Sequence, residues 1–143
     1  GTHGQKTIQA RWAFIVNLPR YAGGLKFSPQ AVGTDGLLDV CTFQKGNWWH
    51  ALRYLSGVLT GRHVNWLDCQ IVRTRRLQVV ADQQSSEEIP FQLDGDPGGV
   101  LPVDIRVLPG RLRLLVSERW AEGHGFPVNQ ESSTLSEQSE TRT

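Results

Sequence analysis

Short runs of alternating apolar and polar residues dominate the chain and predict β-strands, because alternation places every second side chain on one face of a sheet. Residues 37–43 alternate in this way, with Asp39 and Cys41 on the same face. Pro109-Gly110 is a strong turn signal between two such runs, which predicts a hairpin over residues 103–116. The predicted strands are residues 7–17, 37–43, 70–74, 77–81, 89–93, 103–108 and 112–116.

One segment has the period of a helix. It begins at Asn47, which can accept backbone N–H groups of the first turn, and ends at Gly61, which tolerates a left-handed conformation. The internal Gly57 costs about 1 kcal/mol relative to alanine. The apolar stripe expected to cover a sheet edge is Trp48, Leu52, Leu55 and Leu59. About seven or more short strands with one crossover helix predict a mainly β fold, either a β-sandwich or a flattened barrel.

The chain divides into three parts on composition. Its length of 143 residues fits one folded domain, which we place at residues 7–117. Residues 1–6 are expected to be a leader or a vector-derived remnant, since the chain contains no methionine. Residues 118–143 are rich in Ser, Glu, Gln and Thr, and we expect them to form a disordered tail.

The composition also excludes several classes of function. With 15 basic and 14 acidic residues the net charge is +1, so we expect no strong overall attraction to nucleic acid or to an anionic membrane, and no nucleic-acid partner. Cys41 and Cys69 stand in no paired spacing, and none of the four histidines has ligand spacing. We therefore expect no zinc site and no disulfide, but reduced thiols in a cytoplasmic protein. The longest purely apolar run, Trp12–Val16, is far too short to span a bilayer.

Three stretches, in order, resemble motifs of the diacylglycerol kinase and bacterial lipid kinase family. Residues 17–31 resemble an Asn-Gly...Gly-Gly...Pro-x-Ala segment. Residues 34–40, Thr-Asp-Gly-Leu-Leu-Asp-Val, resemble Asp-Asp-Gly-x-Leu-Asp-Val, and residues 92–97, Gln-Leu-Asp-Gly-Asp-Pro, resemble a Val/Ile-Asp-Gly-Glu-Pro box. With the strands around them, these stretches identify residues 12–117 as similar to the C-terminal domain of that family.

The resemblance implies one half of a two-domain enzyme. In the family, an N-terminal α/β domain carries a Gly-Gly-Asp-Gly-Thr loop for ATP, and the C-terminal β-sandwich supplies the lipid-facing side. The implied reaction is ATP-dependent phosphorylation of the hydroxyl of a diacylglycerol-like or sphingoid lipid, with peripheral membrane contact. Gly33 to Gly36 contain only two glycines and lead into a strand, so we expect no phosphate loop there. The nucleotide-binding domain is missing from this chain, and we expect the chain alone to be inactive.

The resemblance also implies a structural Mg²⁺. Its ligands would be the Asp35 carboxylate and the main-chain carbonyls of Val32 and Leu37, all hard oxygen donors of the kind that Mg²⁺ takes. The alternative is a plain turn, because Asp-Gly supplies the positive φ angles that tight turns need. From the residues alone, both interpretations of Asp35 stay open.

Asp96 occupies the position of the family's general base, where the family has glutamate. A base must come within about 2.6–3.2 Å of the proton that it removes, and aspartate is one methylene shorter. The alternative is that residues 93–99 form an ordinary polar loop between two strands. If residues 93–99 are only a loop, the alternative function is that of a non-catalytic β-sandwich module that binds a lipid or a protein.

Two further groups of residues leave alternatives open. The aromatic residues of the helix either border a lipid site or, as is more common at helical spacing, pack in the core; they are Trp48, Trp49 and Tyr54. The basic cluster either faces a phosphate or an anionic membrane, or forms a solvated sheet edge; it comprises Lys26, Arg73, Arg75 and Arg76.

Overall fold

A computed structural model describes residues 6–21, 24–82, 87–112 and 115–123. The chain forms two compact units, residues 1–110 and residues 111–143. In the second unit, helix α2 (Glu118–Gly123) begins with a bond from the Ala121 N–H to the Ser117 carbonyl at 3.0 Å. This helix occupies the first residues of the segment expected to be a disordered tail. Residues 124–143, and residues 1–5 of the expected leader, lie outside the described residues.

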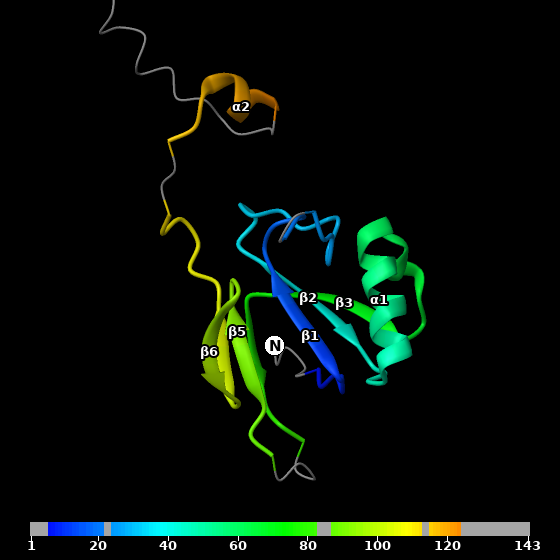
Figure 1. Cartoon of the computed structure of the whole chain (residues 1–143). Helices are drawn as coiled ribbons and strands as arrows, with labels where there is room; N and C mark the ends of the chain where they lie inside the picture. Colours follow the sequence, from blue (N-terminus) through cyan, green and yellow to red (C-terminus); the bar gives the residue numbers. More distant parts are fainter. Residues whose placement is uncertain (1–5, 22–23, 83–86, 113–114, 124–143) are drawn as a thin grey trace, which may run out of the picture. The chain divides into compact units, whose positions relative to one another are not determined.

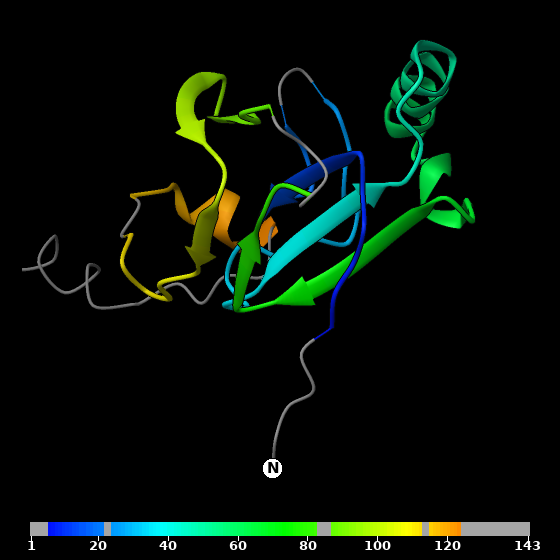
Figure 2. The same cartoon turned by 90° about the horizontal axis from the view of Figure 1, so that it is seen from below.

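The first unit contains a three-stranded antiparallel sheet with β2 (Leu38–Phe43) in the centre (Figures 1 and 2). Strands β1 (Trp12–Val16) and β3 (Cys69–Thr74) flank it. Cys41 lies opposite Phe14 of β1 and Ile71 of β3. Residues 39–43 of β2 are all buried, on both faces of the strand, which explains why this central strand carries few charges.

Helix α1 (Trp48–Thr60) and the short 3₁₀ helix η1 (Arg62–Asn65) connect β2 to β3. The predicted ends of α1 are confirmed. The Asn47 side chain accepts the His50 N–H at 2.9 Å, and Gly61 has φ 74° with its N–H bonded to the Gly57 carbonyl. Since β2 and β3 are adjacent and antiparallel, α1 lies in a connection between neighbouring strands rather than in a crossover between parallel ones.

The core lies between the sheet and the inner side of α1. It consists of Phe27, Cys41, Phe43, Tyr54, Val58 and Cys69. The predicted inward stripe of α1 is wrong: Trp48 is 63% exposed and Leu52 is 50% exposed, whereas Tyr54 and Val58 are buried. The helix is apolar on both sides, so its period alone did not decide which side packs on the sheet. Tyr54 decides it, because its ring stacks on Phe43 with a centroid distance of 4.3 Å.

The remaining four strands form two further antiparallel pairs. β4 (Arg76–Val79) pairs with β7 (Val103–Arg106), and β5 (Pro90–Leu93) pairs with β6 (Asp96–Val100). The β5–β6 hairpin therefore lies within the segment that joins β4 to β7. Strand β6 was not predicted, because its Pro-Gly-Gly composition is typical of a loop.

The predicted hairpin over residues 103–116 is wrong. The partner of β7 is β4, and residues 112, 115 and 116 lie in no strand; residues 113–114 are outside the described residues. The Arg76 guanidinium binds both carboxylate oxygens of Asp104 at 2.7–3.2 Å, an ion pair that links β4 to β7. Alternation along a strand shows which side chains share a face, but it does not identify the partner strand.

The prediction of a mainly β fold with about seven strands and one helix is confirmed for the first unit, whereas the crossover position predicted for that helix is wrong. Over the described ranges no sheet closes into a barrel, so the flattened-barrel alternative drops out and a β-sandwich-like domain remains. Within the same ranges, no helix has the length and apolar character needed to cross a bilayer.

Candidate functional site

The Asp94-Gly95 turn joins β5 to β6 in a tight hairpin. Leu93 pairs with Asp96, so the turn has two central residues, with φ 50° at Asp94 and φ 101° at Gly95. Positive φ at both positions is characteristic of a type I′ turn, whose twist matches the flanking strands. This pair of residues therefore has a structural role, and the alternative of a polar loop over residues 93–99 is replaced by a hairpin.

Asp96 is the first residue of β6 and its side chain is exposed. In the part of the chain that the structure describes, its carboxylate has no hydrogen-bond or ion-pair partner. The backbone is fixed by the hairpin while the acidic group remains accessible. The Asp96 carboxylate is therefore accessible from solvent and takes no part in a structural contact among the described residues.

Val32, Asp35 and Leu37 lie together in the turn that precedes β2. The Asp35 N–H bonds to the Val32 carbonyl at 3.3 Å, and Asp35 Oδ1 accepts the Leu37 N–H at 2.8 Å. The second bond closes an Asx-turn, a local motif in which a carboxylate replaces a backbone acceptor. The turn that the sequence allowed is therefore present, and it contains all three residues of the predicted metal site.

Arg73 connects this turn to the interior of the sheet. Its guanidinium forms an ion pair with the Asp35 carboxylate, and its Nε lies 3.7 Å from Oδ1 of Asp39. Asp39 is 1% exposed; Ser28 donates to its Oδ1 at 2.8 Å, while its Oδ2 has no hydrogen-bond partner among the described residues. A buried carboxylate with one unpartnered oxygen is unusual. Sequence analysis missed this pair, although Asp39 in an inward strand position was a visible signal.

The donors in this turn suit Mg²⁺. They are oxygens, and each carboxylate oxygen of Asp35 retains lone pairs beyond its present contact. Arg73 competes for the same carboxylate, because an ion at Asp35 would share or displace the guanidinium. The donor types therefore suit a divalent cation, and such an ion would have to share Asp35 with Arg73 or displace it.

An apolar pocket of about 280 Å³ lies between the sheet and the inner side of α1. The lining residues with a polar side-chain group are Trp12, through its indole N–H, and Tyr54, whose hydroxyl is already bonded to Asp68 and to the Lys45 N–H. The residues that line the pocket are Trp12, Phe14, Leu25, Phe27, Phe43, Ala51, Tyr54, Leu55 and Val58. Sequence analysis did not locate this pocket, since its walls come from β1, β2, α1 and the segment between β1 and β2. Its chemistry suits a hydrocarbon chain.

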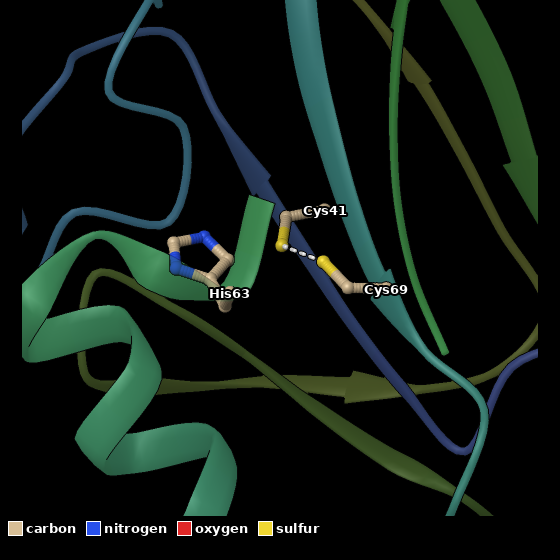
Figure 3. A group of neighbouring side chains, drawn as sticks. All are labelled: Cys41, His63 and Cys69. Carbon is tan, nitrogen blue, oxygen red and sulfur yellow. Dashed lines mark hydrogen bonds between the residues drawn. The ribbon is translucent and has the colours of Figure 1, made fainter. Parts of the chain in front are cut away.

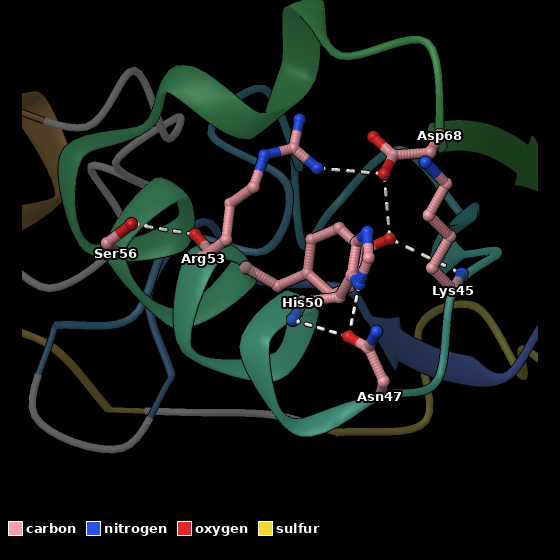
Figure 4. Close-up of polar contacts among 7 residues, drawn as sticks. Lys45, Asn47, His50, Arg53, Ser56 and Asp68 are labelled. Atoms are coloured by element: carbon pink, nitrogen blue, oxygen red, sulfur yellow. Dashed lines mark hydrogen bonds and ion pairs between the residues drawn. The ribbon is translucent and has the colours of Figure 1, made fainter.

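A polar network fixes α1 over this pocket (Figure 4). Arg53 Nη1 and the Tyr54 hydroxyl both bond to Asp68 Oδ2, at 2.8 and 2.9 Å, and the Arg53 guanidinium lies 3.9 Å from the Trp66 ring centroid. Burial raises the pKa of Asp68, but hydrogen bonds from Arg53 and Tyr54 outweigh it and hold the pKa below its ordinary value. Burial and the bond to Asp68 raise the pKa of Tyr54. Tyr54 is therefore structural, and it is the aromatic residue of α1 that packs in the core.

Cys41, His63 and Cys69 form a buried cluster (Figure 3), with one potential ligand atom from each lying within 4.8 Å of the others. Sequence spacing did not reveal it. The two thiols lie 3.9 Å apart and are free, as predicted. Both ring nitrogens of His63 are engaged by backbone carbonyls, of Gly57 at 3.1 Å and Phe27 at 2.9 Å. His63 thus ties α1 to the segment before β2, and we assign the cluster to the core.

Comparison with known proteins identifies the family. Residues 2–116 match the family described as the YegS C-terminal NAD kinase beta sandwich-like domain. The chain belongs to this family. The predicted relationship to the C-terminal domain of diacylglycerol kinases and bacterial lipid kinases is thereby confirmed, and the match includes the Asp35 turn, the pocket and the Asp94-Gly95 hairpin.

Two relatives show how much of such a protein this domain represents. A diacylglycerol kinase of Bacillus subtilis (strain 168) is 30% identical over 110 residues, which cover 76% of this chain and 35% of that protein. A diacylglycerol kinase of Mycobacterium tuberculosis (strain CDC 1551 / Oshkosh) is 30% identical over 99 residues, covering 69% of this chain and 30% of that protein. The chain thus spans about a third of the length of these relatives.

Proposed function

We propose that this domain is the lipid-facing, C-terminal part of a kinase that phosphorylates the hydroxyl of a diacylglycerol-like or sphingoid lipid. The observation that carries the proposal is an apolar pocket of about 280 Å³ in a domain whose relatives are named diacylglycerol kinase. A pocket with apolar walls on the sheet side and on the helix side favours a hydrocarbon chain over a polar metabolite.

Phosphoryl transfer requires a base at the lipid hydroxyl. In our proposal the exposed Asp96 carboxylate accepts the hydroxyl proton while the lipid oxygen attacks the γ-phosphorus of ATP. The bond between the γ-phosphorus and its bridging oxygen breaks, and ADP leaves with that oxygen. ATP itself would be bound by an N-terminal domain, so the chain alone would be inactive.

The Asp35 turn would hold Mg²⁺ through the Asp35 carboxylate and the carbonyls of Val32 and Leu37. The ion would stabilise this turn by drawing three oxygen donors together. Asp35 and Asp96 lie on different sheets of the domain, in the turn before β2 and at the start of β6. We therefore assign the ion a structural role and no part in the proton transfer.

The pocket assignment is tested by titrating the chain with a short-chain diacylglycerol in a calorimeter. Ala51 lines the pocket, and Ala51→Phe should fill part of it and weaken binding about tenfold or more, as expected when apolar burial of a chain segment is lost. Gln78→Phe, an exposed position on β4, is the matched control and should bind like the unmodified chain. Equal binding by all three proteins, or none by the unmodified chain, overturns the assignment.

A second function, lipid binding without phosphoryl transfer, is favoured by one observation. Asp96 is one methylene shorter than the family's glutamate and has no partner among the described residues that would move it toward a substrate. A Gly-Gly-Asp-Gly-Thr loop encoded upstream of this chain would favour the kinase. The test is to join this domain to such a nucleotide-binding domain and to assay phosphoryl transfer from ATP to diacylglycerol. If no phosphate is transferred, lipid binding without catalysis is the function that remains.

A further inference from the structure

The outward side of α1 is unusually apolar for a surface. We define the outer face of α1 as Trp48, Trp49, Leu52, Leu55 and Leu59, which are 48–66% exposed. The two indole rings lie 4.6 Å apart between centroids. Single exposed apolar residues are common, but a contiguous set of five large ones marks a surface that binds something.

The outer face is continuous with the apolar pocket beneath the helix. A groove along the outer face is lined by Trp49, Leu52, Leu55 and Leu59, together with Arg53 and Ser56. Leu55 lines both this groove and the pocket between α1 and the sheet. The Leu55 side chain therefore lies at the boundary between the groove and the pocket.

The chain segment that carries the outer face contains basic residues and no acidic ones. Residues 40–67 contain no aspartate or glutamate, and they include Lys45, Arg53 and Arg62. Lys45 and Arg62 are exposed and lie just before and just after α1. Arg53 is held by Asp68 and stacked on Trp66. Such a surface complements a partner that has anionic groups at its surface and an apolar layer beneath them.

A lipid bilayer with anionic headgroups has both properties. Trp side chains favour the boundary between headgroups and hydrocarbon, because the indole ring is apolar and its N–H is polar. An interfacial helix is recognised by Trp and Leu on one face and Lys or Arg beside it, with no need for the length of a membrane span. A buried protein partner would not explain why the groove continues into a pocket suited to a hydrocarbon chain.

We propose that the outer face of α1 docks this domain on an anionic bilayer surface, so that a lipid's hydrocarbon chain moves from the bilayer past Leu55 into the pocket. The pathway for the lipid rests on the proposed function, whereas the docking does not. α1 lies at the side of the three-stranded sheet, with no strand on its outer side (Figure 1).

Docking is tested by co-sedimentation of the full chain with vesicles of phosphatidylcholine that contain a minority of phosphatidylglycerol, without diacylglycerol or nucleotide. Trp48→Ala combined with Trp49→Ala should reduce the partition coefficient about tenfold or more, since each indole contributes apolar burial. Vesicles of phosphatidylcholine alone should bind more weakly, because Lys45 and Arg62 lose their electrostatic attraction. Binding of the unmodified chain should shift its tryptophan emission to shorter wavelength.

A second variant keeps the proposal testable if the double substitution perturbs folding. Leu52→Asp places an acidic group in the middle of the outer face and should abolish binding to the anionic vesicles. Val80→Asp is the matched control, because Val80 is 61% exposed and belongs to no helix or strand, and it should bind like the unmodified chain. Circular dichroism verifies that all the variants fold.

Several results overturn the proposal. They are absence of vesicle binding by the unmodified chain, equal binding by Leu52→Asp and Val80→Asp, and a Trp48-dependent dimer in solution, which would assign the outer face to a second copy. Loss of vesicle binding when a nucleotide-binding domain is joined to the chain would assign the face to that domain. If the chain binds the vesicles but does not bind diacylglycerol, the proposed function is wrong and the docking proposal stands.

Discussion

Arg73 lies directly opposite Asp39 in the β2–β3 ladder, and the same guanidinium forms an ion pair with Asp35 in the turn before β2. The Arg73 guanidinium therefore interacts with two carboxylates, the exposed one of Asp35 and the buried one of Asp39. Asp39 keeps an oxygen without a hydrogen-bond partner among the described residues. A cation bound at Asp35 would compete with Arg73, so we expect metal binding at the turn to affect the ion pair between Arg73 and Asp39.

We expect Mg²⁺ to raise the melting temperature of the chain, and Asp35→Ala to remove that rise. Asp104→Ala is a suitable control, since Asp104 is another surface carboxylate paired with an arginine, Arg76. The measurement is thermal unfolding with and without millimolar MgCl₂. A chain whose melting temperature never responds to Mg²⁺ contradicts the proposed metal site.

Arg73→Gln should bind Mg²⁺ several-fold more tightly than the unmodified chain, because the competing guanidinium is gone. Without the ion, the same variant should be less stable by about 1–3 kcal/mol, since Asp39 then stays buried without its cationic neighbour. Calorimetric titration and urea unfolding separate the two effects. Unchanged Mg²⁺ affinity would show that Arg73 does not compete for Asp35.

Asp68→Asn should lower stability at neutral pH by roughly 1 kcal/mol, a modest value because Arg53 is 43% exposed and its ion pair is screened. The pKa of Asp68 is depressed in the folded state, so its contribution is present above its unfolded value of about 3.9 and is lost as the pH falls through the folded value. Urea unfolding between neutral and acidic pH measures this. The difference between variant and unmodified chain should shrink in acid; a constant difference argues against a charge effect.

Gly57→Ala should destabilise the chain by about 1–3 kcal/mol, although alanine is the better helix former. A Cβ at this position would lie 2.8 Å from Cζ3 of Trp66, so the ring that packs under α1 would have to move. Ser56→Ala, the neighbouring exposed position, should change stability by less than about 0.5 kcal/mol. Equal stability of the two variants would mean that Trp66 moves without cost.

Asp96→Asn should leave the melting temperature unchanged, since the carboxylate has no partner among the described residues. In the chain joined to a nucleotide-binding domain, the same change should lower phosphoryl transfer to a diacylglycerol about a hundredfold or more, as expected for loss of a general base. Asp94→Asn, whose residue type tolerates the same turn conformation, is the control. Full activity of Asp96→Asn would exclude this carboxylate as the base.

Local signals were predicted well from the sequence. Asn47 and Gly61 end α1 as expected, because capping depends on neighbouring residues only. The orientation of α1 was not predictable in this way, since Trp48 and Leu52 on one side and Tyr54 and Val58 on the other are equally apolar. Likewise β7 was assigned the wrong partner, because strand pairing is settled by contacts far apart in sequence, such as Arg76 with Asp104.

The candidate site likewise has one part that local sequence indicates and other parts that only the folded structure reveals. The Asp35 turn was recognisable because Asp-Gly is a local turn signal, whereas its oxygen donors were named from the family resemblance. The pocket and the Asp39–Arg73 pair were not, since each joins segments that meet only after the sheet has formed. Motifs identified the family, whereas locating the apolar pocket required the three-dimensional arrangement of α1 and β1.

The β5–β6 hairpin nested between β4 and β7 has a consequence for how the chain folds. Arg76 and Asp104 are 28 residues apart, whereas the inner hairpin closes over two residues. Once the inner pair has formed, the loop that the outer pair must close is effectively much shorter, and its entropy cost falls. The β4–β7 ladder should therefore assemble after the hairpin, and substitutions at Asp94 or Gly95 should slow refolding more than they speed unfolding.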